Sequence, residues 1–381
     1  MNEKEFPHLL HLTPDPEMIA TIHQLTSHYM MRSTLPFSLG KDEATYVEYG
    51  FARFADASTC TVRADEPLVL LAAAQWTEVH YRSSYKLFAK QIHLHEPSSN
   101  GFENFLALCI SKAFAGAGGR RLNEVFAFSA PMGSRPPAWA KQHAELVGLY
   151  RAEGGPGATV EVGTVDVAGP APASPAVTLG VNAKSAGETV AWLAHALHAP
   201  VCFPHASMGP DLLFLLRTLD DGRLVWVALQ AKYSTGKDGT LSRYFLRKAI
   251  RSVTPSKFFV DKDGKPFSPA ANPGLVTRTL ELLEGLPDRR DDAGKYSLLR
   301  VVASFPAETN LKRCMEEDPD ADGHPIACLS MKFIKQFTKG FSPVDFLENM
   351  ENKAIGRGRI TGKRTREANA PGPSRRKRLK I

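Results

Sequence analysis

Two apolar runs on either side of an Asp-Gly pair constrain the fold of this chain more than any other feature. The first run extends from Asp211 to Leu219, and the second extends from Leu224 to Tyr233. Asp221-Gly222 lies between them. Apolar runs of this length are typical of β-strands, and an Asp-Gly pair between two of them is a strong signal for a tight turn. The sequence therefore predicts a β-hairpin over residues 211–233.

The simplest register of this hairpin gathers three polar side chains. If Asp221-Gly222 forms a two-residue turn, Asp211 faces Lys232 on the opposite strand. Gln230 precedes Lys232 by two positions and therefore points to the same side of the sheet. We expect Asp211, Gln230 and Lys232 to lie together at the end of the hairpin away from the turn. A longer turn or a bulge would change this register.

These three residue types suit metal-assisted phosphoryl chemistry. Carboxylate and amide oxygens, as in Asp211 and Gln230, are ligands for hard cations such as Mg²⁺ or Mn²⁺. Such a cation polarises a phosphoryl oxygen and lowers the pKa of a bound water. A lysine such as Lys232 can orient that water and balance the charge that develops on the phosphate. The alternative is a strand end that carries solvated polar residues without a function.

The order of these residues resembles the PD-(D/E)XK nuclease superfamily. Gly209-Pro210-Asp211 precedes the first strand, and Gln230-Ala231-Lys232 ends the second. More narrowly, residues 202–259 are similar to fungal nuclease-like proteins of Crinkler and transposon-associated families, in which glutamine commonly replaces the acid of the second motif. The resemblance implies an α/β, restriction-endonuclease-like fold with a mixed sheet flanked by helices. It also implies Mg²⁺- or Mn²⁺-dependent hydrolysis of DNA, with Asp211 and Gln230 binding the metal and Lys232 positioning the water.

Glu103 is the residue that matches the superfamily's glutamate on the first core helix. Apolar residues recur at helical spacing from Phe102 to Phe114, after a turn predicted at residues 98–101. In one interpretation Glu103 faces the sheet edge and completes the metal site. In the other, Asn100 and Glu103 form a capping box, and Glu103 only satisfies its own helix N-terminus. Because Gln230 is neutral, a metal site with two carboxylates needs Glu103. The second interpretation leaves Asp211 as the one carboxylate, and it therefore favours a non-catalytic module that binds nucleic acid or protein.

A basic helix is predicted directly after the hairpin. Arg243, Arg247 and Arg251 recur every four residues, with Lys248 beside them. Leu241, Phe245 and Ala249 are expected on another, apolar face. The basic residues suit contacts to the phosphate backbone of nucleic acid, and a solvated helix face is the alternative.

The positive charge of the chain is concentrated in its C-terminal tail, residues 357–380. The net charge is +7, but the tail holds ten of the 47 basic residues and one of the 40 acidic ones, so the remainder carries −2. Two basic clusters flank a spacer rich in Ala and Pro, which predicts disorder and resembles a bipartite nuclear localisation signal. The clusters are Lys363, Arg364, Arg375, Arg376, Lys377 and Arg378. We therefore expect an import receptor as partner and the nucleus as compartment; a general polybasic tail for nucleic acid or acidic lipid is the alternative.

The remaining features bound the class of protein. We expect an N-terminal helical or mixed region over residues 1–97, a nuclease-like domain over 98–350 with a Gly/Pro/Ala-rich insertion near 154–180, and the tail over 351–381. Five scattered cysteines indicate a reducing compartment. The most apolar run, residues 67–76, is too short to cross a bilayer, so no membrane partner is expected. His93, His95 and Glu96 lack a nearby further metal ligand.

Overall fold

The computed structural model describes most of the chain except the two ends and several connecting segments. The described residues are 16–30, 37–56, 60–64, 66–81, 87, 99–114, 118–129, 136–151, 160–164, 179–195, 199–236, 238–259, 273–284, 297–314, 323–338 and 347. The tail therefore lies outside the described residues, as do His93, His95 and Glu96. None of the helices in these ranges combines the length and apolarity that a bilayer crossing requires.

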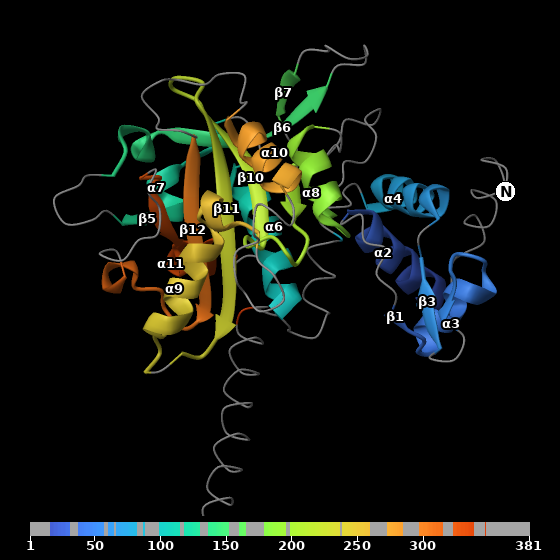
Figure 1. The fold of residues 1–381 in the computed structure, drawn as a ribbon. Helices are drawn as coiled ribbons and strands as arrows, with labels where there is room; N and C mark the ends of the chain where they lie inside the picture. Colours follow the sequence, from blue (N-terminus) through green and yellow to red (C-terminus); the bar gives the residue numbers. More distant parts are fainter. Residues whose placement is uncertain are drawn as a thin grey trace, which may run out of the picture.

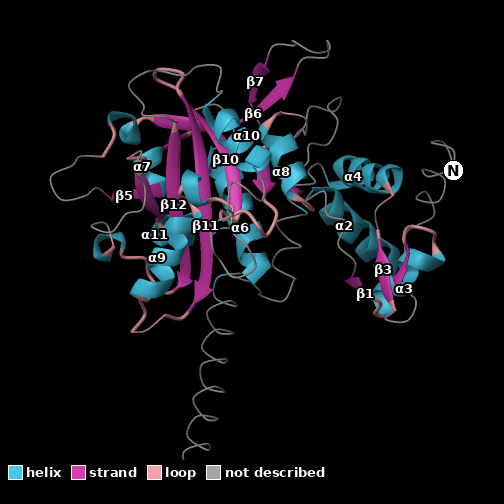
Figure 2. Ribbon diagram, in the orientation of Figure 1, coloured by secondary structure: helices cyan, strands magenta, loops and turns pink. Residues whose placement is uncertain are grey.

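A ten-stranded mixed sheet forms the centre of the molecule (Figures 1 and 2). Its main path runs β4 (Arg120–Arg121), β6 (His143–Arg151), β10 (Leu212–Thr218), β11 (Leu224–Ser234), β12 (Leu298–Pro306), β13 (Ile326–Leu329) and β5 (Phe126–Ser129). Three further strands join it, namely β7 (Val160–Thr164), β8 (Gly180–Asn182) and β9 (Val201–Phe203). The β10–β11 pair is antiparallel and β11–β12–β13 are parallel, so the predicted mixed sheet is confirmed.

Helices cover both faces of this sheet, which explains the near-continuous apolar sequence of its central strands. One face packs against α6 (Ser99–Phe114) and α11 (Met331–Thr338) through residues such as Leu229. The other face packs against α8 (Ala186–Leu193) and α10 (Pro273–Glu284) through residues such as Trp226. Toward the far end of β11 the same face packs against α9 (Arg243–Ser252). The shorter α7 (Leu122–Val125), η1 (Ala138–Lys141), η2 (Pro255–Lys257) and η4 (Leu311–Arg313) connect these elements.

The N-terminal region builds a second, smaller sheet. Its strands β1 (Phe37–Ser38), β2 (Arg53–Asp56) and β3 (Thr61–Arg63) form an antiparallel sheet in the order β1–β3–β2. Helices α2 (Pro16–Met30), α3 (Lys41–Glu48) and α4 (Pro67–Tyr81) accompany it. Residues from these helices share an apolar cluster around Ile22 and Tyr46.

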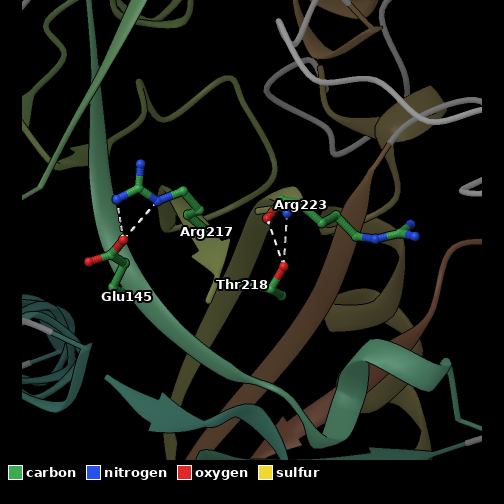
Figure 3. Close-up of polar contacts among 4 residues, drawn as sticks. All are labelled: Glu145, Arg217, Thr218 and Arg223. Atoms are coloured by element: carbon green, nitrogen blue, oxygen red, sulfur yellow. Dashed lines mark hydrogen bonds and ion pairs between the residues drawn. The ribbon is translucent and has the colours of Figure 1, made fainter. Parts of the chain in front are cut away.

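The hairpin is present, but the predicted two-residue turn is wrong. The observed register pairs Leu212 with Leu229 and Arg217 with Leu224, so the connection is longer. The backbone N–H of Arg223 donates to the Thr218 hydroxyl oxygen at 2.9 Å, which closes a loop over residues 219–222 (Figure 3). Because the register moves by an even number of residues, the same side chains remain on each face.

Side-chain bonding around the loop explains why the Asp-Gly pair does not form the tight turn. The Asp221 carboxylate accepts hydrogen bonds from the Thr218 hydroxyl and from the Arg223 backbone N–H. Gly222 has a φ of +70°, which glycine adopts without strain. The neighbouring Arg217 binds Glu145 of β6 through Nε and Nη2, which joins the hairpin to the next strand (Figure 3). Local polar contacts therefore select the longer loop.

Two further expectations are corrected by the structure. Helix α6 begins at Ser99, so the turn predicted over residues 98–101 is wrong at its C-terminal end. Phe245, expected on the apolar face of the basic helix, is 47% exposed. Leu246, Ala249 and Ile250 instead form the buried face of α9. Apolar residues spaced by three or by four positions can both line one face of a helix. Contacts with the sheet, which the sequence does not show, determine which of these faces is buried.

Candidate functional site

Asp211 lies at the entrance to β10, where a close backbone contact holds the chain. The Asp211 backbone N–H donates to the Leu229 carbonyl at 2.9 Å. Two residues earlier, the Gly209 N–H donates to the Phe258 carbonyl. A Cβ on Gly209 would overlap the backbone of Ser252 at the end of α9. Glycine is therefore required for the approach of this segment to α9, and that approach fixes where Asp211 stands.

Asp211 and Gln230 are joined by a direct hydrogen bond across the hairpin. Asp211 Oδ2 accepts from Gln230 Nε2, and it also accepts from the Ala231 backbone N–H at 2.7 Å. On its other side, Gln230 Oε1 accepts from Ser252 Oγ. Gln230 is 3% exposed, so its amide is held between Asp211 and α9 rather than in solvent.

Three ionisable groups influence one another at this end of the sheet. Burial, together with the negative charge of Asp211, raises the pKa of Glu103 from 4.5 to about 8. Burial also raises the pKa of Asp211 from 3.8 to about 6, against the opposing effects of Lys232 and of the Ala231 N–H. The pKa of the Lys232 ammonium is lowered by burial, although both carboxylates favour its charged form. The sheet end thus brings two carboxyl groups and one amine together.

Glu103 reaches this group from the opposite face of the sheet. It projects from α6, whereas Gln230 is bound to α9. Because α6 begins at Ser99, Asn100 lies inside the helix, and its spacing to Glu103 does not describe an N-cap and its partner. The carboxyl group of Glu103 interacts electrostatically with Asp211 and Lys232. This placement favours the interpretation in which Glu103 belongs to the site.

The donor set fits a divalent cation through two carboxylates. Both carboxyl groups are desolvated, and the charge of Asp211 raises the pKa of Glu103, so a cation bound between them would relieve this repulsion. In the orientation described, Gln230 turns its amide nitrogen toward Asp211 and its oxygen toward Ser252. Gln230 therefore donates a hydrogen bond to Asp211 and does not turn its oxygen toward a cation at the carboxylates. Within the described ranges, no cluster of three or more His, Cys, Asp or Glu side chains is placed to hold a metal.

The basic residues of α9 lie on its exposed side. Arg243, Arg247, Lys248 and Arg251 are all exposed. Lys248 is close enough to Lys232 to lower its pKa, so the basic surface extends to the site. The structure thus brings the predicted hairpin residues, Glu103 and the basic helix to one region of the molecule.

Two residues of this region were missed by reasoning from the sequence. Ser252 ends α9 and binds Gln230, but a serine at a helix end is too common to signal a site. Gly209 permits the contact with α9, and its position two residues before Asp211 was the available signal.

Comparison with known proteins adds no relative. No protein-family model matches the chain, and the searches of curated proteins and of solved structures likewise give no match.

Proposed function

We propose that this chain is a metal-dependent nuclease that hydrolyses DNA phosphodiester bonds, with a restriction-endonuclease-like domain that carries the site. The observation that carries the proposal is the convergence of Glu103, Asp211 and Lys232 at one end of a mixed sheet. The exposed basic side of α9 beside them supports a phosphate-rich substrate. The order of Asp211, Gln230 and Lys232 along the hairpin supports the assignment to the PD-(D/E)XK superfamily.

In this proposal Glu103 and Asp211 hold Mg²⁺ or Mn²⁺. The cation supplies charge stabilisation at the phosphoryl oxygens and acidifies a water. Gln230 Nε2 and the Ala231 N–H both donate to Asp211 Oδ2, so they fix the orientation of that carboxylate. Lys232 Nζ would hold the attacking water. Because the pKa of Lys232 is lowered, its neutral amine can accept the proton that this water loses. Arg243, Arg247, Lys248 and Arg251 bind backbone phosphates on either side.

The second candidate is a nuclease-fold module that binds nucleic acid or protein without cutting. The amide of Gln230 favours it, because a neutral side chain hydrogen-bonded to Asp211 stands where a further carboxylate would strengthen a cation site. The two candidates share the fold and the basic surface. They differ in whether a cation binds and whether a phosphodiester bond breaks.

Plasmid cleavage by the purified protein decides between them. We expect cutting in Mg²⁺ or Mn²⁺ that EDTA abolishes, and a decrease of roughly 10²-fold or more in Asp211→Ala and Lys232→Ala. Asp220→Ala and Lys184→Ala are matched controls, because both residues are exposed and lie outside the site. If no metal supports cutting while salt-sensitive DNA binding is retained, the non-catalytic module is correct.

We also propose that the tail directs the protein to the nucleus through an import receptor. The two basic clusters, Lys363-Arg364 and 375–378, support this proposal by their spacing and charge.

A further inference from the structure

Two adjacent aromatic side chains project into solvent from the first turn of α9. Tyr244 is 71% exposed and Phe245 is 47% exposed. Their rings meet edge to face, with centroids 5.4 Å apart. The helix is held on the sheet by other residues, Leu246, Ala249 and Ile250, which belong to a buried cluster. The aromatic pair is therefore not needed for docking α9 on the sheet.

Helical spacing aligns this pair with the basic residues and with the site. Tyr244 shares a face with residues three, four and seven positions later, which are Arg247, Lys248 and Arg251. Phe245 shares a face with Lys248 and with Ser252. Ser252 binds Gln230, so the row that starts at Phe245 leads to the candidate site.

The described part of α9 is positively charged. Helix α9 contains no acidic residue. Lys312 of η4 is exposed, and η4 packs against α9 through Leu311. Among the residues that the structure describes, Asp238 and Glu308 are acidic and lie by the loop that precedes the helix, where the Glu308 N–H donates to the Gly239 carbonyl. A ligand that is anionic and also offers flat apolar faces would complement this surface.

We propose that Tyr244 and Phe245 form a stacking platform for unpaired nucleobases, so that the substrate of the proposed nuclease contains single-stranded DNA next to the cleaved bond. Exposed rings bind single strands because every base has a stacking face, and basic residues follow the phosphates. A regular duplex hides these faces inside its base stack. This inference rests on the proposed function, and it adds the class of DNA that the site prefers.

The test compares single strands with a duplex of the same sequence. Fluorescence anisotropy in EDTA measures the binding of labelled oligonucleotides to full-length Asp211→Ala protein, which prevents cleavage during the titration. In this background, Tyr244→Ala with Phe245→Ala should weaken single-strand binding by roughly tenfold or more. Duplex affinity should stay unchanged, and replacing both rings by tryptophan should retain single-strand binding. Tyr49→Ala with Phe54→Ala is the matched control, because those rings are 41% and 48% exposed on the N-terminal region.

Three outcomes would overturn this inference. The first is unchanged single-strand binding in the double alanine variant. The second is an equal loss for single strands and duplex, which would assign the pair to general contact with DNA. The third is that a poly-glutamate peptide competes with the labelled single strand as strongly as an unlabelled oligonucleotide of equal charge does. This result would show that the surface recognises charge alone. Failure of the nuclease proposal is separate, because it would appear as absent plasmid cleavage with ring-dependent single-strand binding intact.

Discussion

Glu103 carries the most perturbed charge of the candidate site, since its pKa is raised from 4.5 to about 8 by burial and by Asp211. Between these two pH values the folded protein retains a proton that the unfolded chain has released. The free energy of unfolding must therefore decrease as the pH rises through this window. Asp211 contributes in the same direction between 3.8 and about 6.

Glu103→Gln should remove the part of this pH dependence that comes from Glu103, in the metal-free protein. We expect the variant to exceed wild type in unfolding free energy at pH 8.5 by on the order of a few kcal/mol, and to differ little at pH 4. Urea unfolding in EDTA across the pH range measures this difference. Glu48→Gln, at an exposed position, is the control. Parallel stability curves for wild type and Glu103→Gln would contradict the assignment of Glu103 to the desolvated site.

Gln230→Glu should convert the orienting amide into a further carboxylate. Without metal, the variant should be less stable than wild type, because Asp211 loses a hydrogen-bond donor and gains a like charge. With Mn²⁺ its melting temperature should rise by more than that of wild type, since a bound cation stabilises the folded state. Thermal unfolding with and without Mn²⁺ measures both effects, and Asn123→Asp is the charge-matched control at an exposed position. Equal shifts in wild type and Gln230→Glu would argue against a cation at this site.

Among the secondary-structure elements, the segment before β10 and the end of α9 are in close contact at Gly209 and Ser252, so the position of the hairpin depends on that of the basic helix. Gly209→Ala would place a methyl group against the backbone of Ser252, where no side chain can move aside. We expect a loss of about 1–3 kcal/mol in stability and a marked loss of cleavage, because either Asp211 or α9 must shift. Gly274→Ala is the matched control, since a Cβ there meets open space within α10, and it should be neutral or slightly stabilising. Chemical denaturation and the plasmid assay test both variants.

The hairpin and α9 were predictable from the sequence only in part. Their presence was predictable because apolar runs and turn residues are local signals. The hairpin register was not, because side-chain bonds between Thr218, Asp221 and Arg223 favour the longer loop over the tight turn. Asp211, Gln230 and Lys232 nevertheless stay on one face, because strand alternation tolerates an even shift. The exposure of Phe245 was missed, because helical spacing alone does not select the buried face of α9.

For the whole molecule, the charge is divided between a slightly acidic body and the basic tail. Deleting residues 357–381 should abolish nuclear accumulation of a fluorescent fusion, whereas deleting residues 165–178, a shorter stretch that contains no Lys or Arg, should not. Cell imaging measures this. In vitro, the tail deletion should also weaken the salt dependence of DNA binding, because fewer counterions are released. Unchanged nuclear accumulation would leave the tail as a general polybasic segment.

The sequence could not predict how the whole sheet is assembled. β6 and β10 pair across a long intervening segment that carries β7, β8, α8 and β9, and only spatial packing shows this. Glu103 was matched to the site by resemblance, since nothing in the spacing between Glu103 and Asp211 predicts their proximity.

The parallel pairing of β11 with β12 has a consequence for folding kinetics. Their partners, such as Trp226 and Leu298, lie far apart in the chain, whereas β10 and β11 are joined by a short loop. Closing a long chain segment costs entropy before its contacts form, so pairings of this kind fold slowly. We expect the hairpin with Asp211 and Gln230 to form early and β12 to dock late. During that interval one edge of β11 stays unpaired, which makes chaperone binding or aggregation the main competitor of correct folding.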